Sequence, residues 1–304
     1  MLDLISMFTP PISLMLLGLY FKYKSFFNIN FWEGAEKLNY YILFPALLFS
    51  SLANAKDDVA GIKSILIIIF IVMFVIIIFS YLLAIIKKVS EKQMGVYIQS
   101  LIRFNTYLGL SIALTLPDEQ IRIILVSILA IAIPFVNVIS ILSLTSKHNL
   151  NLKNIFYSLI KNPLINSCLI GIGFNYFSIK IWIGFDNLLS ILSTSSLMLG
   201  LLCVGAAINF DVIRKNFIRS LSISIVRLFL IPLFTILISS FFILNSASLI
   251  AIIIFFSIPT ASSAYVLTKV LGGDHELMAG IISLQTLLCL ISLPVIMYLI
   301  ENFK

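Results

Sequence analysis

Two arginines stand inside long apolar stretches of the sequence. Arg103 lies within IQSLIRFNTYLGLSIAL (98–114), and Arg227 lies at a similar depth in the stretch 217–243. Each is about ten residues from the start of its stretch, or roughly 15 Å along a helix, which is half of the hydrocarbon thickness. A charge at that depth costs at least ~2.5 kcal/mol, so each arginine needs a partner, water or a function.

Acidic residues are distributed differently from these arginines. All 13 Asp and Glu residues lie in loops or at the ends of apolar stretches. A fixed positive charge without a buried acid favours an anionic ligand and disfavours a cation exchanger built on an embedded aspartate. The alternative is that each side chain snorkels to the surface or binds carbonyls freed by a broken helix. The sequence leaves both interpretations open for both arginines.

Small polar residues interrupt two matching stretches, one in each half of the chain. The first is the segment around Arg103, and the second is FFSIPTASSAYVLTKVLGGD (255–274), where a proline removes a backbone donor. Such residues often serve only as packing contacts between helices, but their matched positions favour a binding site. Gln285, in the last stretch, faces either a cavity or a neighbouring helix. The predicted substrate-binding residues are Arg103, Asn105, Thr106, Tyr107, Pro259, Thr260, Ser262, Ser263 and Gln285.

Enzymatic chemistry is disfavoured by the residues present. The two histidines, His148 and His275, lie in loops, so no embedded Ser–His pair or histidine metal site can be assembled. No Walker A loop is present, which disfavours ATP-driven pumping. Cys168, Cys203 and Cys289 are isolated in apolar stretches and are interpreted as small core residues. We expect no enzyme activity, no cofactor and no metal.

The elements that must position these residues are membrane helices. The chain is 61% hydrophobic and 11% charged, with a mean hydropathy of +1.13, and a membrane span takes roughly 20 apolar residues. The first stretch lacks a basic start and is interpreted as a span rather than a signal peptide. Backbone amides in lipid need internal partners, and these runs are too long for barrel strands, so helices are predicted. The ten predicted spans are residues 4–21, 38–54, 62–86, 94–116, 121–144, 157–177, 183–208, 217–243, 247–268 and 277–300.

Basic residues separate into two sets when the loops alternate between sides. Of the 20 Lys and Arg residues, thirteen fall on one side, five on the other and two inside spans. The positive-inside rule then places loops 87–92, 145–161 and 211–219 in the cytoplasm, and the loop 55–61 and both termini outside it. The same rule explains the net charge of +7 without nucleic acid as a partner.

The segment TSKHNLNLKN (145–154) divides the chain into two groups of five spans. We predict a first repeat at 1–146, a cytoplasmic linker at 147–156 and a second repeat at 157–304. Because each half has an odd number of spans, the halves must be inverted. Short echoes support the repeat: LPD (116–118) matches GGD (272–274), and Pro134 matches Pro294.

Taken together, these motifs resemble the auxin efflux carrier family, in its bacterial permease type, some members of which are assigned to malonate. The resemblance is carried by LNYYILFPALLFSSLA (38–53), RFNTYLGLSIAL (103–114), KNPLINSCLIGIGFN (161–175), LGLLCVGAAI (199–208) and the segment 258–294. It implies an all-α polytopic fold of ten transmembrane helices in two inverted five-helix repeats. Helices 4 and 9 would break and cross at 103–107 and 259–263. Helices 1, 2, 6 and 7 would form a scaffold, and the others a moving transport unit.

The expected function is that of a secondary transporter for a small organic anion, such as a malonate-like carboxylate, working by alternating access in the cytoplasmic membrane. Plant members of the family usually have a proline in the first crossing, where this chain has Ile102, Arg103, Phe104 and Asn105. That difference puts auxin itself in doubt as the substrate. The alternatives are a non-transporting sensor or scaffold, an auxin-like weak-acid exporter, and a channel. The sequence leaves open coupling to an ion gradient and assembly as a homodimer.

Overall fold

The computed structural model describes residues 2–54, 62–86, 88–144 and 160–302, and these residues form helices without a β-strand. The predicted linker 147–156 lies outside the described residues. The elements of the first half are α1 (Leu2–Tyr23), α2 (Ile29–Leu38), η1 (Asn39–Leu43), α3 (Phe44–Ala53), α4 (Ile62–Ile86), α5 (Glu91–Ile102), α6 (Thr106–Thr115) and α7 (Glu119–Leu144). Those of the second half are α9 (Pro163–Tyr176), α10 (Ile183–Ala206), α11 (Phe210–Lys215), α12 (Phe217–Ile225), η3 (Val226–Leu230), α13 (Ile231–Ser239), α14 (Ser246–Ser257), α15 (Ser263–Val270) and α16 (His275–Asn302).

Five of these helical stretches are long and apolar enough to cross a membrane unbroken. They are Lys63–Ile86, Glu119–Leu144, Ile183–Ala206, Phe217–Ser239 and His275–Leu299. The predicted fourth and ninth spans are absent from this set because each is divided into two short helices, α5 with α6 and α14 with α15. The all-helical membrane class is therefore confirmed, while the count of ten spans stays a prediction.

Close backbone contacts hold one group of helices together. A Cβ on Gly205 of α10 would lie 1.8 Å from the Met15 carbonyl oxygen of α1, and one on Gly18 would lie 2.1 Å from the Leu202 carbonyl oxygen. Only glycine permits this approach. Gly205 and Gly18 therefore allow close packing of α1 on α10. α3 also packs along α9 and α10, so α1, α3, α9 and α10 form one packed group.

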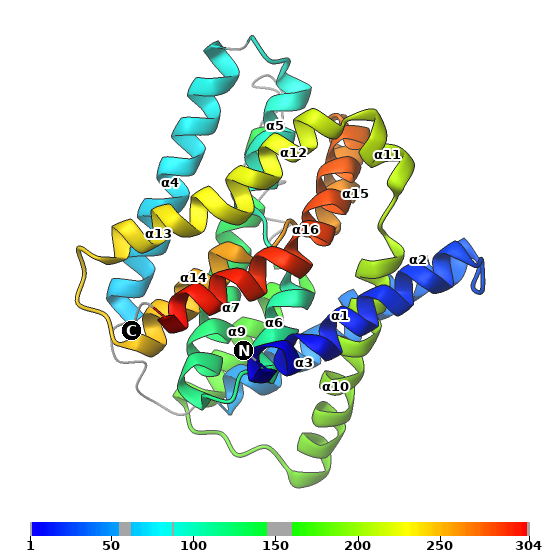
Figure 1. Cartoon of the computed structure of the whole chain (residues 1–304). Coiled ribbons are helices and arrows are strands. Elements are labelled where there is room, and N and C mark those ends of the chain that lie inside the picture. Colours follow the sequence, from blue (N-terminus) through cyan, green and yellow to red (C-terminus); the bar gives the residue numbers. More distant parts are fainter. Residues whose placement is uncertain (1, 55–61, 87, 145–159, 303–304) are drawn as a thin grey trace.

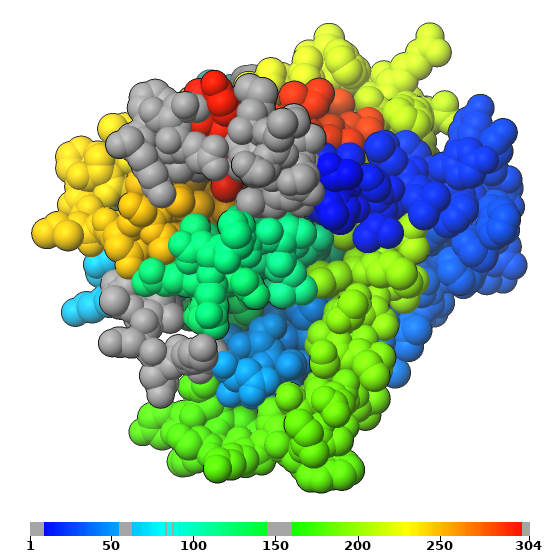
Figure 2. Space-filling model, turned by 60° about the horizontal axis from the view of Figure 1, so that its bottom comes forward, coloured from blue at the N-terminus to red at the C-terminus, as the bar shows by residue number. Residues whose placement is uncertain are grey.

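A second group surrounds the buried helix α14. Six consecutive residues of that helix, Ala251–Phe256, are at most 1% exposed, and α14 packs against α7, α13 and α16. Helices α5 and α6 also pack on α7. Figure 2 shows the blue N-terminal helices beside the yellow-green α10, on the opposite side of the molecule from the yellow and orange α13 and α14.

Two π-helical turns widen the helical path directly before a proline. In η1 the Phe44 N–H donates to the Asn39 carbonyl, five residues back, and Pro45 follows. In η3 the Ile231 N–H donates to the Val226 carbonyl in the same way, and Pro232 follows. A proline lacks the donor for its own turn and its ring clashes with the carbonyl four residues earlier, which accounts for the widening.

The LPD (116–118) and GGD (272–274) echoes have a common local cause. Asp118 accepts the backbone N–H groups of Gln120 and Ile121 at the start of α7. Asp274 accepts the Leu277 N–H at the start of α16. Each aspartate therefore caps the helix that follows a divided pair.

The connections gather at two ends of the molecule in Figure 1. The start of α2, the end of α4, the α11–α12 junction and the start of α16 lie toward the top and right of the view. Both marked termini and the connection from α13 to α14 lie toward the lower left. This arrangement fits the alternation used in the charge count, and which end faces the cytoplasm stays a prediction.

Candidate functional site

The first divided pair breaks at residues 103–105. Helix α5 ends at Ile102, and Arg103 continues with an extended backbone (φ −71°, ψ 139°). Asn105 then starts α6, because its side-chain oxygen accepts the Leu108 N–H at 3.1 Å. Asparagine is among the preferred residues for this capping position. The break therefore needs no proline.

The second divided pair breaks at residues 258–262, where Pro259 is the cause. Ile258 ends α14 with φ −72° and ψ 135°, nearly the same backbone conformation as Arg103. A residue before proline is excluded from helical geometry, and the proline donates no hydrogen bond. α15 then begins at Ser263.

The two breaks meet each other. The Asn105 N–H donates to the Pro259 carbonyl at 2.7 Å. The Thr260 hydroxyl lies 2.7 Å from the carbonyl oxygen of Ser100, in the last turns of α5. The breaks at 103–107 and 259–263 therefore contact each other, as the family resemblance implies, and their depth in a membrane stays a prediction.

Gln285 of α16 forms hydrogen bonds to both chain segments at this crossing. Its Oε1 accepts the Thr260 N–H at 2.8 Å, and its Nε2 donates to the Ser100 carbonyl at 3.3 Å. The Thr260 hydroxyl is also 2.7 Å from Oε1, and having one hydrogen it donates either there or to Ser100. Gln285 is fully buried. Of the two alternatives for this residue, the neighbouring helix is the one observed.

Arg227 lies next to the crossing, and its side chain is 1% exposed. Its Nε donates to the Ile258 carbonyl at 3.0 Å, and its Nη1 donates to the Leu101 carbonyl. These acceptors lie at the ends of α14 and α5. The structural interpretation of this arginine, as a partner for carbonyls freed by broken helices, is therefore observed.

Arg103 has a different environment, although it too lies at the crossing. It is only partly buried, and its Nη2 donates to the Ser263 hydroxyl at 3.1 Å. The Tyr40 side chain, in the π-helical turn η1, lies within electrostatic range of it. No carboxylate pairs with it among the described residues. Arg103 is thus a charge with spare donors next to the start of α15.

Tyr107 forms the contact between the crossing and the other group of helices. Its ring packs on Phe44 at a centroid distance of 4.7 Å and an angle of 78°. It also covers Gly200 of α10, where an added Cβ would lie 2.6 Å from the Tyr107 ring. Tyr107 therefore faces the boundary between the two groups of helices.

The predicted site residues divide into two kinds. Asn105, Pro259, Thr260 and Gln285 are buried and hold the crossing together. The residues that are at least partly exposed are Arg103, Thr106, Tyr107, Ser262 and Ser263.

Two residues of the η1 turn, Asn39 and Tyr40, were not among the predicted site residues. Tyr40 lies in the π-helical turn directly before Pro45, and such turns are often found at functional sites. Asn39 precedes it, and its amide exchanges hydrogen bonds with Ser196 of α10. No sequence signal links Asn39 to Ser196.

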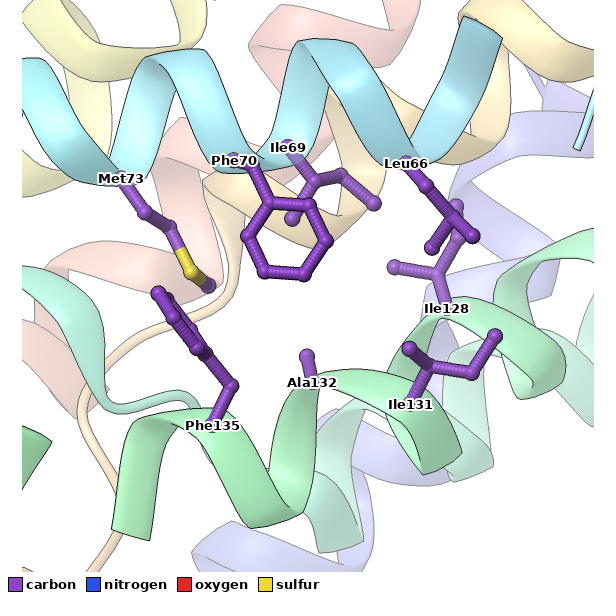
Figure 3. A pocket seen from close by; sticks show the side chains of 8 residues that line it. All are labelled: Leu66, Ile69, Phe70, Met73, Ile128, Ile131, Ala132 and Phe135. Atoms are coloured by element: carbon purple, nitrogen blue, oxygen red, sulfur yellow. The ribbon is translucent and has the colours of Figure 1, made fainter. Parts of the chain in front are cut away.

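An apolar hollow between α4 and α7 offers no competing site for an anion. Figure 3 shows its lining, which is entirely aliphatic, aromatic or thioether. The residues are Leu66, Ile69, Phe70, Met73, Ile128, Ile131, Ala132 and Phe135. A carboxylate there would lose its hydration without gaining a hydrogen bond. The crossing is therefore the better candidate.

A family model described as a membrane transport protein matches residues 140–297, just over half of the 304-residue chain. No curated protein matches the chain.

Proposed function

Because the chain belongs to the membrane transport protein family, the auxin efflux carrier family of membrane transporters, we propose that it carries a small organic anion across the cytoplasmic membrane. The substrate class is a carboxylate such as malonate. The observation that carries this proposal is the partly buried Arg103, which lies at the crossing of two broken helices. Within the described part of the chain, its guanidinium has only the neutral Ser263 as a hydrogen-bond partner.

The local electrostatics support an anionic ligand. Helices α6 and α15 both begin at the crossing. The amino-terminal end of a helix carries roughly +0.5 charge. Ser262 at the start of α15 makes no side-chain capping bond. Arg103 adds a planar set of donors that can pair with both oxygens of a carboxylate. The carboxylate would exchange its hydration for these donors.

Two packed groups of helices support alternating access as the mechanism. In this proposal α1, α2, α3, α9 and α10 form the scaffold, and the helices around α14 move with the crossing. Tyr107 lies at the boundary, against Gly200 and Phe44. A flat ring on a glycine surface resists sliding less than interlocked side chains would. Rigid-body motion there would expose Arg103 to one side and then the other.

The experiment that tests this function is counterflow in proteoliposomes. Purified protein is reconstituted with unlabelled malonate inside and labelled malonate outside. A carrier accumulates label transiently, whereas a sensor or scaffold cannot exchange it. Arg103→Gln should abolish the exchange, and Lys24→Gln, which removes an exposed charge between α1 and α2, should not. An absence of exchange for every small carboxylate and for indole-3-acetate would reject the proposal.

The proposal also includes the topology, with ten membrane spans and both termini outside the cytoplasm. Lys215, at the end of α11, and Lys180, between α9 and α10, are both exposed. Single cysteines at these two positions, in a background without native cysteines, should react with an impermeant reagent from opposite sides of the membrane. Reaction from the same side would contradict the topology.

A further inference from the structure

The carboxyl-terminal ends of two helices converge on a single side chain. Leu101 lies in the last turn of α5, and Ile258 caps the end of α14. The carbonyl oxygens of both accept hydrogen bonds from the guanidinium of Arg227. One positive charge therefore bridges the two helix ends that stop at the crossing.

The guanidinium is balanced by backbone rather than by an acid. Arg227 is 1% exposed, and no carboxylate contacts it in the described part of the chain. Its Nη2 has no hydrogen-bond partner there, and the Cys289 thiol of α16 is a polar neighbour. The π-helical turn η3, before Pro232, carries the side chain to this position.

The charges at this point nearly cancel. A helix carries roughly −0.5 charge at its carboxyl terminus, so two such ends together need about one positive charge. In transporters built from broken helices, half-helix carboxyl ends and unwound carbonyls coordinate the coupling Na⁺ or H⁺. Here a covalently attached cation occupies that position.

We propose that Arg227 is an internal cation that replaces a coupling ion at the crossing. The two helix ends are then neutralised permanently, and the opposite, positive ends are left for the anion at Arg103. The chain would consequently carry its anion without needing Na⁺ or another monovalent cation. This consequence for transport rests on the proposed function, whereas occupation of the cation position is tested without any substrate.

The substrate-free test measures the melting temperature of the full-length protein in detergent. Arg227→Ala leaves two carbonyls facing a vacated space, and we expect its melting temperature to fall by about 10 °C. Guanidinium at about 20 mM, far below the molar concentrations that unfold proteins, should restore several degrees relative to choline at equal ionic strength. Wild type should respond equally to both salts. Arg214→Ala, which removes an exposed arginine of α11, is the matched control and should show no rescue.

Several outcomes would overturn the proposal. One is an Arg227→Ala protein that melts equally in guanidinium, Na⁺ and choline; another is an equal rescue of Arg214→Ala. If Arg227→Ala yields no folded protein, the comparison moves to Arg227→Lys and Arg227→Met, which have similar length. The lysine variant should melt higher because it keeps the charge. A methionine variant as stable as the lysine variant would show that the charge is not needed.

The transport arm uses the wild-type protein. Malonate counterflow should proceed at the same rate when Na⁺ is replaced by choline on both sides of the membrane. A dependence on Na⁺ would overturn the proposal. If no malonate exchange occurs in either salt, the proposed function fails, and the melting-temperature arm still decides whether Arg227 occupies a cation position.

Discussion

The backbone N–H of Asn105 donates to the carbonyl oxygen of Pro259 across 2.7 Å, and this bond joins the broken helix of one half of the chain to that of the other. Asn105 also caps α6 through its side chain. One residue therefore starts a helix and ties it to the second break. The candidate site at the crossing keeps its geometry only while this hydrogen bond is formed.

Cross-linking should detect the junction directly. Cysteines replacing Asn105 and Thr260, with Cys168, Cys203 and Cys289 changed to alanine, should join through a short bifunctional thiol reagent. The control pair is Asn105 with Ala247, which lies ten residues before the end of α14, or roughly 15 Å along that helix. Equal cross-linking of the two pairs, or none in the first, would contradict the crossing.

The hydrogen bonds of Gln285 should stabilise the folded protein. Gln285→Ala leaves the Thr260 N–H buried without its acceptor, so we expect a loss of about 1–3 kcal/mol in the free energy of unfolding. Gln93→Ala is the control, since Gln93 pairs with Asp274 at a less buried position where water can replace it. Denaturation in detergent measures both variants. A Gln285→Ala protein as stable as Gln93→Ala would show that these hydrogen bonds contribute little.

The helices themselves were largely predictable from the sequence. Long apolar runs become helices in a membrane protein because lipid offers no partner for a backbone amide. The described helices fall close to the predicted stretches for this reason. The breaks were expected from the family resemblance, and the polar residues around Arg103 and Pro259 marked their positions, whereas the helix cap formed by Asn105 was seen only in the structure.

The partners of the polar residues were not predictable in the same way. Arg227 binds carbonyls of Leu101 and Ile258, and these three residues are brought together only by the packing of η3 against α5 and α14. The sequence therefore left its role open together with that of Arg103. Tyr40 was not predicted for a similar reason, because Arg103, which lies within electrostatic range of it, belongs to a distant segment of the chain.

The contact of Tyr107 with Gly200 should be sensitive to a single methyl group. Gly200→Ala places a Cβ 2.6 Å from the Tyr107 ring and 2.8 Å from Nδ2 of Asn39, so one of these side chains must shift. Overpacking of this kind lowers the free energy of unfolding by about 1–3 kcal/mol. Exchange of substrate should also slow, because the added methyl group hinders the motion of the two groups of helices against each other.

Gly173 in α9 provides the matched control for that substitution. A Cβ added there meets nothing within 4 Å, and alanine is a better helix former than glycine by up to about 1 kcal/mol. Gly173→Ala should therefore keep full exchange and equal or higher thermal stability. Equal exchange rates for Gly200→Ala and Gly173→Ala would argue against a moving boundary at Tyr107.

Arg103 should determine affinity for the anion, and its hydrogen bond to Ser263 sharpens the test. Loss of a charged hydrogen-bond partner costs ~1.5–3 kcal/mol, so Arg103→Gln should weaken binding roughly tenfold to a hundredfold. Arg103→Lys should retain weak binding, because the charge remains but the planar fork is lost.

Ser263→Ala should bind the anion at least as tightly as wild type, because Arg103 no longer has to break its 3.1 Å hydrogen bond to Ser263 before it binds the anion. Substrate affinity is measured in folded, detergent-purified variants, with Arg227→Gln as the comparison for a buried arginine. Unchanged affinity in Arg103→Gln would reject the binding role, and a loss in Ser263→Ala equal to that in Arg103→Gln would place the hydroxyl itself on the substrate.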